Sequence, residues 1–263
     1  MLTLLLLPLA SGAKAQEANG PAFPVVASFA AEEAQQGVAV DRDFIYVIGN
    51  DVIGKYDRKS FRRVARFKDA PNGHLQHMNG GVVVGDRLYC SHSNFPDTPM
   101  TSSVEIFDTK TLRHVGSQAF GIDAGSLVWL DQYKGDWYVC FGHYNGKGGE
   151  AGMKNDRSVL VRYDREWRRK GAWTFPKALV DRWDGMTCSG GVIDRDGTIY
   201  ATGHHAPELH VLRFPSAGAQ LELTRVISSP VEGQGIALDM TGRQLIQMQR
   251  KERKIYVFAL PRR

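Results

Sequence analysis

Histidine is the residue type whose placement in this chain points most directly to chemistry. Six of the 8 histidines fall close to the ends of short apolar segments. An imidazole titrates near neutral pH, so it can carry a proton between a substrate and a neighbouring group. Three or four neutral imidazoles together can instead bind Zn, Fe or Cu. The six residues are His74, His77, His92, His143, His204 and His205.

The sequence alone does not decide between proton transfer and metal binding. We predict His204 as the main catalytic proton carrier, with His77, His92 and His143 as further catalytic residues. A carboxylate beside an imidazole would fix its tautomer, and the candidates are Glu33, Asp97, Asp123, Asp184, Glu208 and Glu232. The alternative is a His-bound divalent metal as cofactor. The histidines are far apart in the sequence, so no local spacing motif identifies such a metal.

Other polar residues accompany the histidines at the ends of the apolar segments. Their neighbours in the sequence are mostly Val, Ile, Tyr and Leu, and polar groups that converge on an apolar framework are typical of ligand sites. We therefore predict seven ligand-binding residues, namely Gln36, Asn50, Asn79, Ser126, Ser189, Gln234 and Gln249.

The elements that position these residues belong to a module that recurs five times. Each copy has an apolar first strand, a second strand and a third strand. The third strand ends in an aromatic residue followed by Asp in the first three copies. Self-similarity at a period of roughly 45 residues predicts a β-propeller of five four-stranded antiparallel blades. The expected first strands begin at Gly37, Gly81, Ser126, Gly191 and Gly235.

The two ends of the repeat region predict how the ring closes. The fifth copy lacks a fourth strand, and Phe23–Ala30 reads as a lone strand ahead of the first copy. We expect this segment to complete the last blade, because an open sheet edge invites aggregation. The repeats run nearly end to end, so residues 16–263 are predicted to form a single domain.

Propeller topology predicts where the polar residues meet. The first strand of each blade lines the central channel, and its start and the end of the second strand lie on one face. His204 ends a segment of the same length as the one that ends at Asn50, so it is the best placed histidine. Two insertions, Ser93–Ser103 and Tyr144–Arg157, should rise over the same face, where loops commonly carry function.

The N-terminus predicts export. Leu2–Ala10 is apolar but too short to span a bilayer, and small residues follow at Ala13 and Ala15. We interpret residues 1–15 as a signal peptide, which places the mature protein in the periplasm or outside the cell with no membrane anchor.

Charge and cysteine content narrow the function classes. The formal net charge is +5, and the basic clusters Arg165–Lys170 and Arg250–Lys254 are predicted to be solvated turns that bind no nucleic acid.

The 3 cysteines match no CxxC motif and are expected to be buried free thiols. The positions at the starts of the expected first strands, where a glycosidase would need its acids, hold Gln36, Asn79, Ser126, Ser189 and Gln234. None of these is an acid, which disfavours ordinary glycoside hydrolysis. The absence of a GxSxG elbow argues against a serine hydrolase.

Three stretches of the chain resemble a group of secreted propeller proteins described as cycloisomerase-like or lactonase-like. They are HMNGGVVVGDRLYCSHSN, PMTSSVEIFDTKTLRHVGS and ATGHHAPELHVLRFP, and the similarity extends through most of Glu33–Pro261. The resemblance implies intramolecular ring opening or closure, without assigning catalytic residues. A more distant likeness is to five-bladed glutaminyl-peptide cyclotransferases. Their Phe-Thr-Gln-Gly opening is matched only in part by AQQG at Ala34–Gly37.

These observations lead to two functional hypotheses. The first is an exported enzyme that acts on a small polar ligand by acid–base isomerisation, lactone opening or cyclisation at the channel mouth. The second is a non-catalytic propeller that binds a carbohydrate or protein partner on the same face. Because consecutive strand residues face opposite ways, we expect only one of His204 and His205 to be functional, and His204 is the better placed.

Overall fold

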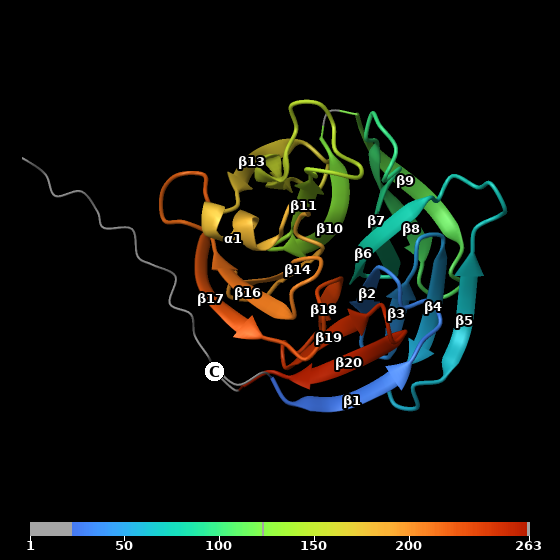
Figure 1. Ribbon diagram of the computed structural model, residues 1–263. Coiled ribbons are helices and arrows are strands. Elements are labelled where there is room, and N and C mark those ends of the chain that lie inside the picture. Colours follow the sequence, from blue (N-terminus) through green and yellow to red (C-terminus); the bar gives the residue numbers. More distant parts are fainter. Residues whose placement is uncertain (1–22, 123, 262–263) are drawn as a thin grey trace, which may run out of the picture.

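The computed structural model describes residues 23–122 and 124–261. The predicted signal peptide, residues 1–15, lies outside the described residues. The described chain forms five four-stranded antiparallel sheets arranged in a ring (Figure 1). The predicted five-bladed β-propeller is therefore confirmed.

The blades follow one another along the sequence. The first consists of β2 (Gly37–Val40), β3 (Phe44–Ile48), β4 (Val52–Asp57) and β5 (Arg63–Lys68). The second consists of β6 (His77–Val84), β7 (Arg87–Ser93), β8 (Ser102–Asp108) and β9 (His114–Gly121). The third consists of β10 (Ser126–Tyr133), β11 (Asp136–Gly142), β12 (Val159–Tyr163) and β13 (Arg169–Thr174). The fourth consists of β14 (Gly190–Ile193), β15 (Ile199–Thr202), β16 (Glu208–Arg213) and β17 (Glu222–Ser228). The fifth consists of β18 (Ile236–Leu238), β19 (Gln244–Gln249), β20 (Lys254–Ala259) and β1 (Val25–Ala30).

Burial along the strands explains the radial order of each blade. The inner strands β2 and β14 are buried at every position, because a neighbouring blade covers each face of the sheet. The outer strands β5 and β9 alternate between more and less exposed residues, as expected for strands with one face towards solvent. Figure 1 shows β2, β6, β10, β14 and β18 around the centre of the ring.

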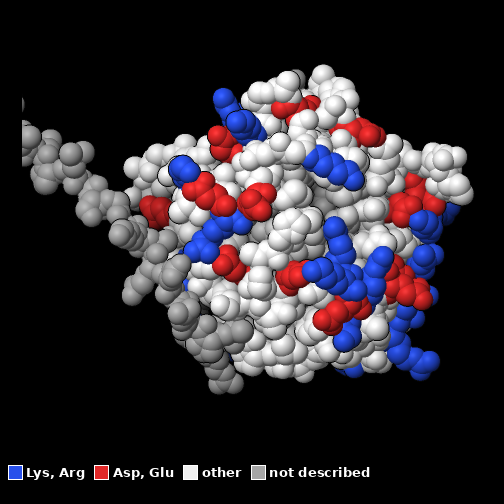
Figure 2. Space-filling view, in the orientation of Figure 1, with Lys and Arg blue, Asp and Glu red and all other residues white. Residues whose placement is uncertain are grey.

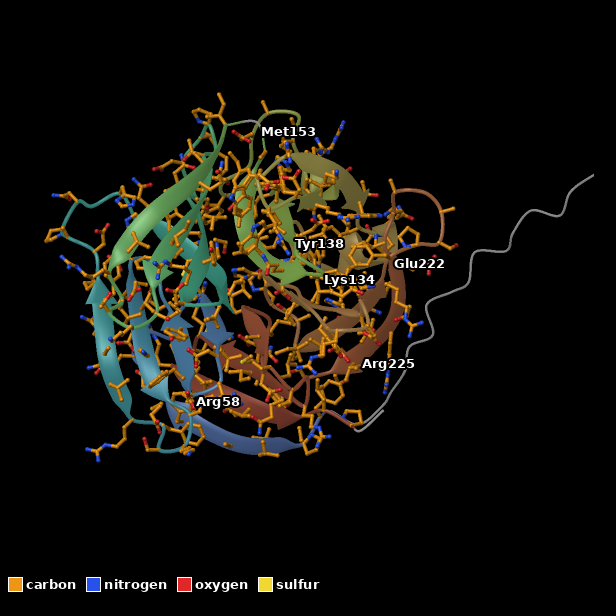
Figure 3. All side chains as sticks on the ribbon, turned by 180° about the vertical axis from the view of Figure 1, so that it is seen from behind. Arg58, Lys134, Tyr138, Met153, Glu222 and Arg225 are labelled. Atoms are coloured by element: carbon orange, nitrogen blue, oxygen red, sulfur yellow. The ribbon has the colours of Figure 1, made fainter. Side chains whose placement is uncertain are left out.

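Close packing between blades constrains particular residues. Trp129 of β10 is 1% exposed and packs against Gly191 of β14. A Cβ atom at position 191 would lie 2.3 Å from the indole ring, so only glycine allows this approach. Arg58, which is labelled in Figure 3, lies in the turn after β4. It donates hydrogen bonds to Asp239 and Gln244 and so links the first blade to the fifth.

The ring closes through the N-terminal strand, as predicted. β1 pairs antiparallel with β20, with Ala30 opposite Lys254 at one end of the ladder. Phe29 of β1 stacks on Phe61, with ring centroids 4.8 Å apart. The fifth blade therefore combines strands from both ends of the described chain.

Three local features depart from a regular repeat. β6 begins at His77 rather than at the expected Gly81, and a bulge interrupts its register between Met78 and Gly81. The third blade contains a short 3-10 helix, Asn155–Arg157, within its insertion. The helix α1 (Lys177–Arg182) follows that blade, and together these segments lengthen the third repeat.

Further predictions concern the cysteines and the surface. Cys90, Cys140 and Cys188 are buried and free, as expected. Acidic and basic side chains are interspersed on the face seen in Figure 2. Among the residues that the structure describes, no helix combines the length and apolar character needed to cross a membrane.

Candidate functional site

A small cavity lies at the end of the channel where the inner strands begin. Its volume is about 60 Å³. Four of the predicted ligand-binding residues line it from four different blades, namely Gln36, Asn79, Ser189 and Gln234. The other lining residues are His77, Phe95, Val128, Tyr144, Met186, His204 and Arg250. We call this set the mouth pocket.

Arg250 is held in the mouth pocket by neutral oxygens. Its Nε donates to the backbone carbonyl of Gln35 at 2.6 Å, and its terminal nitrogen donates to Oε1 of Gln36 at 2.6 Å. Gln36 in turn donates to Oδ1 of Asn50 at 2.6 Å. Arg250 forms no ion pair with any described residue, so its positive charge is free to attract an anionic group.

The side-chain amide of Asn79 is a further hydrogen-bond donor in the mouth pocket, and it lacks a partner. Nδ2 of Asn79 is buried and has no hydrogen-bond partner among the described residues. A buried amide without a partner is costly, and most such groups in folded proteins are paired. An acceptor oxygen of a ligand in the mouth pocket would satisfy this amide.

The two histidines of the mouth pocket are neutral near pH 7. Burial, together with the positive charges of Arg250 and Lys147, lowers the pKa of His77 to about 4. Burial also lowers the pKa of His204 to about 4, with help from His205 and Arg250. A neutral imidazole keeps one nitrogen free to accept a proton.

His204 and His205 contact each other, contrary to the expectation that they face opposite ways. Their Nδ1 atoms are 3.2 Å apart and their ring centroids 4.2 Å apart. The alternation of strand side chains does not apply here, because β15 ends at Thr202. His204 lines the mouth pocket, whereas His205 is exposed. The pair can therefore pass a proton between the pocket and solvent.

The two insertions cover the mouth pocket together. Phe95 of the first and Tyr144 of the second lie in contact, with ring centroids 4.8 Å apart. A Cβ atom at Gly148 would lie 2.3 Å from the ring of Phe95, so the second insertion also presses on the first. The backbone amide of Met100 donates to Glu150 at 2.8 Å. Phe95 also contacts His77, with ring centroids 5.0 Å apart.

The other two candidate catalytic histidines do not line the mouth pocket. Met78 pairs with His92 across the sheet, so His92 faces away from the side that His77 occupies. His92 accepts a hydrogen bond from the backbone amide of Gln76 at 3.1 Å, and its other nitrogen lies 3.0 Å from Oγ of Ser103. The imidazole of His143 lies against Gly125, where an added Cβ atom would be 2.8 Å away.

The remaining predicted ligand-binding residues, Asn50, Ser126 and Gln249, do not line the mouth pocket. The hydroxyl of Ser126 is 2.8 Å from that of Ser93. Asn50 accepts the hydrogen bond from Gln36 described above, and Oε1 of Gln249 accepts from the backbone amide of Lys251 at 3.4 Å.

Three of the six candidate carboxylates form hydrogen bonds or ion pairs away from the mouth pocket. Glu33 accepts from Tyr56 and pairs with Arg63, and Glu232 pairs with Lys251. Glu208 pairs with Arg182 and His210. Asp123 lies outside the described residues. Within the described ranges, no carboxylate is hydrogen bonded to His77 or His204, so the partner of His204 is a second imidazole.

Arg250 is a residue of the mouth pocket that the sequence pattern does not identify. Lys251, Glu252 and Arg253 of its cluster lie in an exposed turn, as predicted. The guanidinium of Arg250, in contrast, is held in the pocket by the carbonyl of Gln35 and the side chain of Gln36. The sequence feature that could have identified Arg250 is its position directly after Gln249, at the end of a second strand. Phe95 and Tyr144 were also missed, since insertions give no register by which to place a side chain.

A possible metal-binding group lies away from the channel mouth. His74, Glu105 and His114 bring three ligand atoms within 4.8 Å of one another. Glu105 belongs to β8 and His114 to β9, in the outer half of the second blade. None of these three residues lines the mouth pocket.

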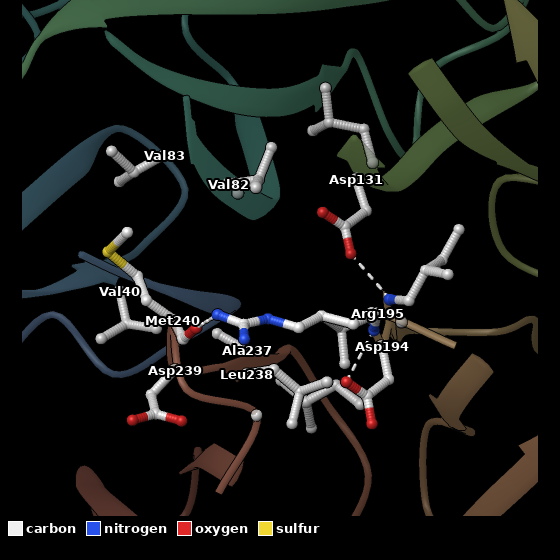
Figure 4. A pocket seen from close by; sticks show the side chains of 17 residues that line it. Val40, Val82, Val83, Asp131, Asp194, Arg195, Ala237, Leu238, Asp239 and Met240 are labelled. Atoms are coloured by element: carbon white, nitrogen blue, oxygen red, sulfur yellow. Dashed lines mark hydrogen bonds between the residues drawn. The ribbon is translucent and has the colours of Figure 1, made fainter. Parts of the chain in front are cut away.

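A larger cavity of about 150 Å³ lies at the other end of the channel, where the inner strands finish. Its lining is mostly aliphatic and includes two buried carboxyl groups, those of Asp131 and Asp239 (Figure 4). Burial raises the pKa of Asp131 to about 7. The carboxylate accepts hydrogen bonds from the backbone amides of Ile193 and Gln132, each at 2.7 Å. Asp131 is thus satisfied within the protein, which favours the mouth pocket as the ligand site.

Comparison with known proteins supports the fold. A glutaminyl cyclase from Myxococcus xanthus is similar with a TM-score of 0.58 and 10% sequence identity, over 92% of this chain and 100% of that chain. A gluconolactonase from Xanthomonas campestris is similar with a TM-score of 0.51 and 14% identity, over 86% of this chain and 71% of that chain. No family model and no curated protein matches this sequence. At these identities, the likeness shows a shared propeller fold.

Proposed function

We propose that this protein is an exported enzyme that moves a proton on a small polar ligand in the mouth pocket. The observation that supports this best is the convergence of four groups. Two neutral imidazoles, His77 and His204, share one covered cavity with the unpaired amide of Asn79 and the guanidinium of Arg250. Export rests on the apolar segment and small residues within residues 1–15.

The roles of these groups follow from their chemistry. His204 accepts a proton as general base, and His205 connects it to solvent. Asn79 and Arg250 are donors that can stabilise negative charge on a substrate oxygen. Isomerisation, lactone opening and cyclisation all need a proton acceptor and a stabilised oxyanion, so the same arrangement serves each of them.

Lactone opening illustrates how the atoms balance. His204 takes a proton from water while the water oxygen bonds to the lactone carbonyl carbon. The carbonyl oxygen becomes an oxyanion, stabilised by Asn79 and Arg250. The carbonyl then re-forms, the bond to the ring oxygen breaks, and that oxygen takes the proton from the imidazolium. The products are a carboxylic acid and an alcohol, and cyclisation is the reverse.

The charge around the pocket favours a ligand with an acidic or carbonyl group. Arg250 and Lys147 both act on His77, and neither charge is cancelled within the lining. The cavity of about 60 Å³ admits only a small ligand or the reacting end of a larger one. The glutaminyl cyclase and the gluconolactonase are similar propellers whose names denote cyclisation and lactone chemistry.

The second hypothesis, a propeller that binds a carbohydrate without turnover, also has one supporting observation. Phe95 and Tyr144 line the mouth pocket and could stack on a sugar ring. A purely binding site, however, has no need for imidazoles connected to solvent.

A substrate panel tests the proposal. Wild-type protein and the His204→Gln variant are incubated with small lactones, hydroxy acids and N-terminal glutaminyl peptides, and products are measured by mass spectrometry. The proposal expects turnover of one class by the wild type and a large loss in the variant. Binding of a sugar by calorimetry, with no turnover anywhere in the panel, would favour the carbohydrate hypothesis.

A further inference from the structure

The second blade contains a cluster of ionisable side chains that the proposed function does not use. Glu105 is 2% exposed, and its Oε2 atom faces two imidazoles. The Nε2 atom of His114 lies 2.7 Å from Oε2, and the Nε2 atom of His74 lies 3.5 Å from it. The rings of His74 and His114 are 5.3 Å apart and meet edge to face.

We propose that His74, Glu105 and His114 form a site for a divalent transition metal of the zinc type. Two imidazole nitrogens and one carboxylate oxygen are a set that zinc binds, with a water in the fourth position. Zinc–ligand bonds of about 2.0–2.2 Å in tetrahedral geometry place the ligand atoms roughly 3.4 Å apart. The two carboxylate–imidazole separations, 2.7 and 3.5 Å, lie on either side of this value, and all three ligand atoms are within 4.8 Å of one another. Small rotations of the side chains would therefore complete the site.

The groups behind the cluster orient the carboxylate. Oε1 of Glu105 accepts hydrogen bonds from Ser103 at 2.6 Å and from Ser117 at 3.0 Å. These bonds hold one oxygen and leave Oε2 directed at the imidazoles. Supporting contacts of this kind are typical of metal sites, where they fix the orientation of the ligands. The ring of His114 also packs edge to face on Phe107, with centroids 5.2 Å apart.

His92 connects the hydrogen bonds that orient Glu105 to the backbone at Gln76. Its Nε2 atom accepts a hydrogen bond from the amide of Gln76, so the neutral ring carries its proton on Nδ1 and donates to Ser103. Ser103 donates onward to Glu105. A continuous chain of hydrogen bonds therefore runs from the connection between the first two blades to the carboxylate. This assigns His92 a positioning role in the proposed metal site.

The position of the ligands indicates what the metal would do. His74 lies in the connection between β5 and β6, whereas Glu105 and His114 belong to the outer strands of the second blade. A metal bound to all three would fasten this connection to the blade. The side chain of His74 is 60% exposed. Water can therefore reach the fourth coordination position of a metal bound there. Metal bound only by the folded state stabilises that state by mass action.

Metal binding by the full chain tests the proposal, with Co²⁺ as a spectroscopic probe and Zn²⁺ as competitor. We expect one Co²⁺ per chain in equilibrium dialysis, with the visible absorption of a tetrahedral site, lost on addition of Zn²⁺. Because His74 is exposed, the His74→Ala variant should fold normally and bind metal at least about tenfold more weakly. Zn²⁺ should raise the melting temperature of the wild type and not that of the variant.

A second histidine variant provides the matched control. His205→Ala removes an exposed imidazole near the mouth pocket and should bind Co²⁺ like the wild type. The proposal is overturned if the wild type binds no Co²⁺, if His74→Ala binds it with unchanged affinity, or if His205→Ala loses it. These results do not depend on enzymatic turnover, so they are separate from the test of the proposed function.

Discussion

At the scale of single residues, the proposed chemistry depends on imidazoles that stay neutral in the folded protein. His77 and His204 owe this to burial and to nearby positive charge. The cost is that protonation at low pH opposes folding, because a charged imidazole is disfavoured in the pocket but not in the unfolded chain. Function and acid sensitivity therefore have the same physical origin.

The pH dependence of stability follows from these pKa values. The folded pKa of about 4 lies below the ordinary value of 6.5, so the unfolded chain binds more protons between these limits. The free energy of unfolding should decrease as the pH falls from about 6.5 to 4. For His77 alone the decrease should be of the order of 1–3 kcal/mol. Urea denaturation at several pH values measures it, and a His77→Gln variant with the same slope as the wild type would contradict the assignment.

Arg250 is predicted to act through its charge on the ligand. Replacing Arg250 with Gln removes a charged donor and should raise KM for an acidic substrate roughly tenfold to a hundredfold. Lys251→Gln is the matched control, since Lys251 is an exposed neighbour that pairs with Glu232. Steady-state kinetics of both variants measure the effect. Equal KM values for the two variants would show that Arg250 does not contact the ligand.

At the scale of elements, the strand β1 determines whether the fifth blade is complete. It covers the edge of β20 and packs Phe29 against Phe61 and Tyr56. This strand is therefore as important to the ring as any strand within a repeat, although it lies farthest in sequence from its partner.

Removal of β1 should expose the edge of β20 and cause association between molecules. A chain that begins at Ala31 is expected to elute as aggregates in size-exclusion chromatography, whereas a chain that begins at Phe23 should elute as a single species. A monodisperse, soluble chain without β1 would mean that the ring does not depend on this closure.

At the scale of the whole molecule, the repeat pattern was enough to predict the fold. Glycine-led apolar strands and their recurrence predicted five blades, and the lone segment Phe23–Ala30 predicted the closure. The same topology predicted that Gln36, Asn79, Ser189 and Gln234 meet at the channel mouth, because each precedes the expected start of an inner strand.

Details that depend on register and long-range contacts could not be predicted from the repeat. The bulge between Met78 and Gly81 shifts the pairing of β6, and so His92 faces Ser103 rather than the pocket. The contact between His204 and His205 arises in a loop, where strand alternation gives no guide. Arg250 is captured by Gln35 and Gln36, more than 200 residues earlier in the chain.

The central claim is that His204 carries the proton, and paired alanine variants test it most directly. The measurement is kcat/KM on the substrate identified by the panel, together with the melting temperature. His204→Ala should lose roughly a hundredfold to ten-thousandfold in kcat/KM with a melting temperature within a few degrees of the wild type. His205→Ala should lose much less, because solvent can replace its role. Full turnover by His204→Ala, or a greater loss in His205→Ala, would contradict the account.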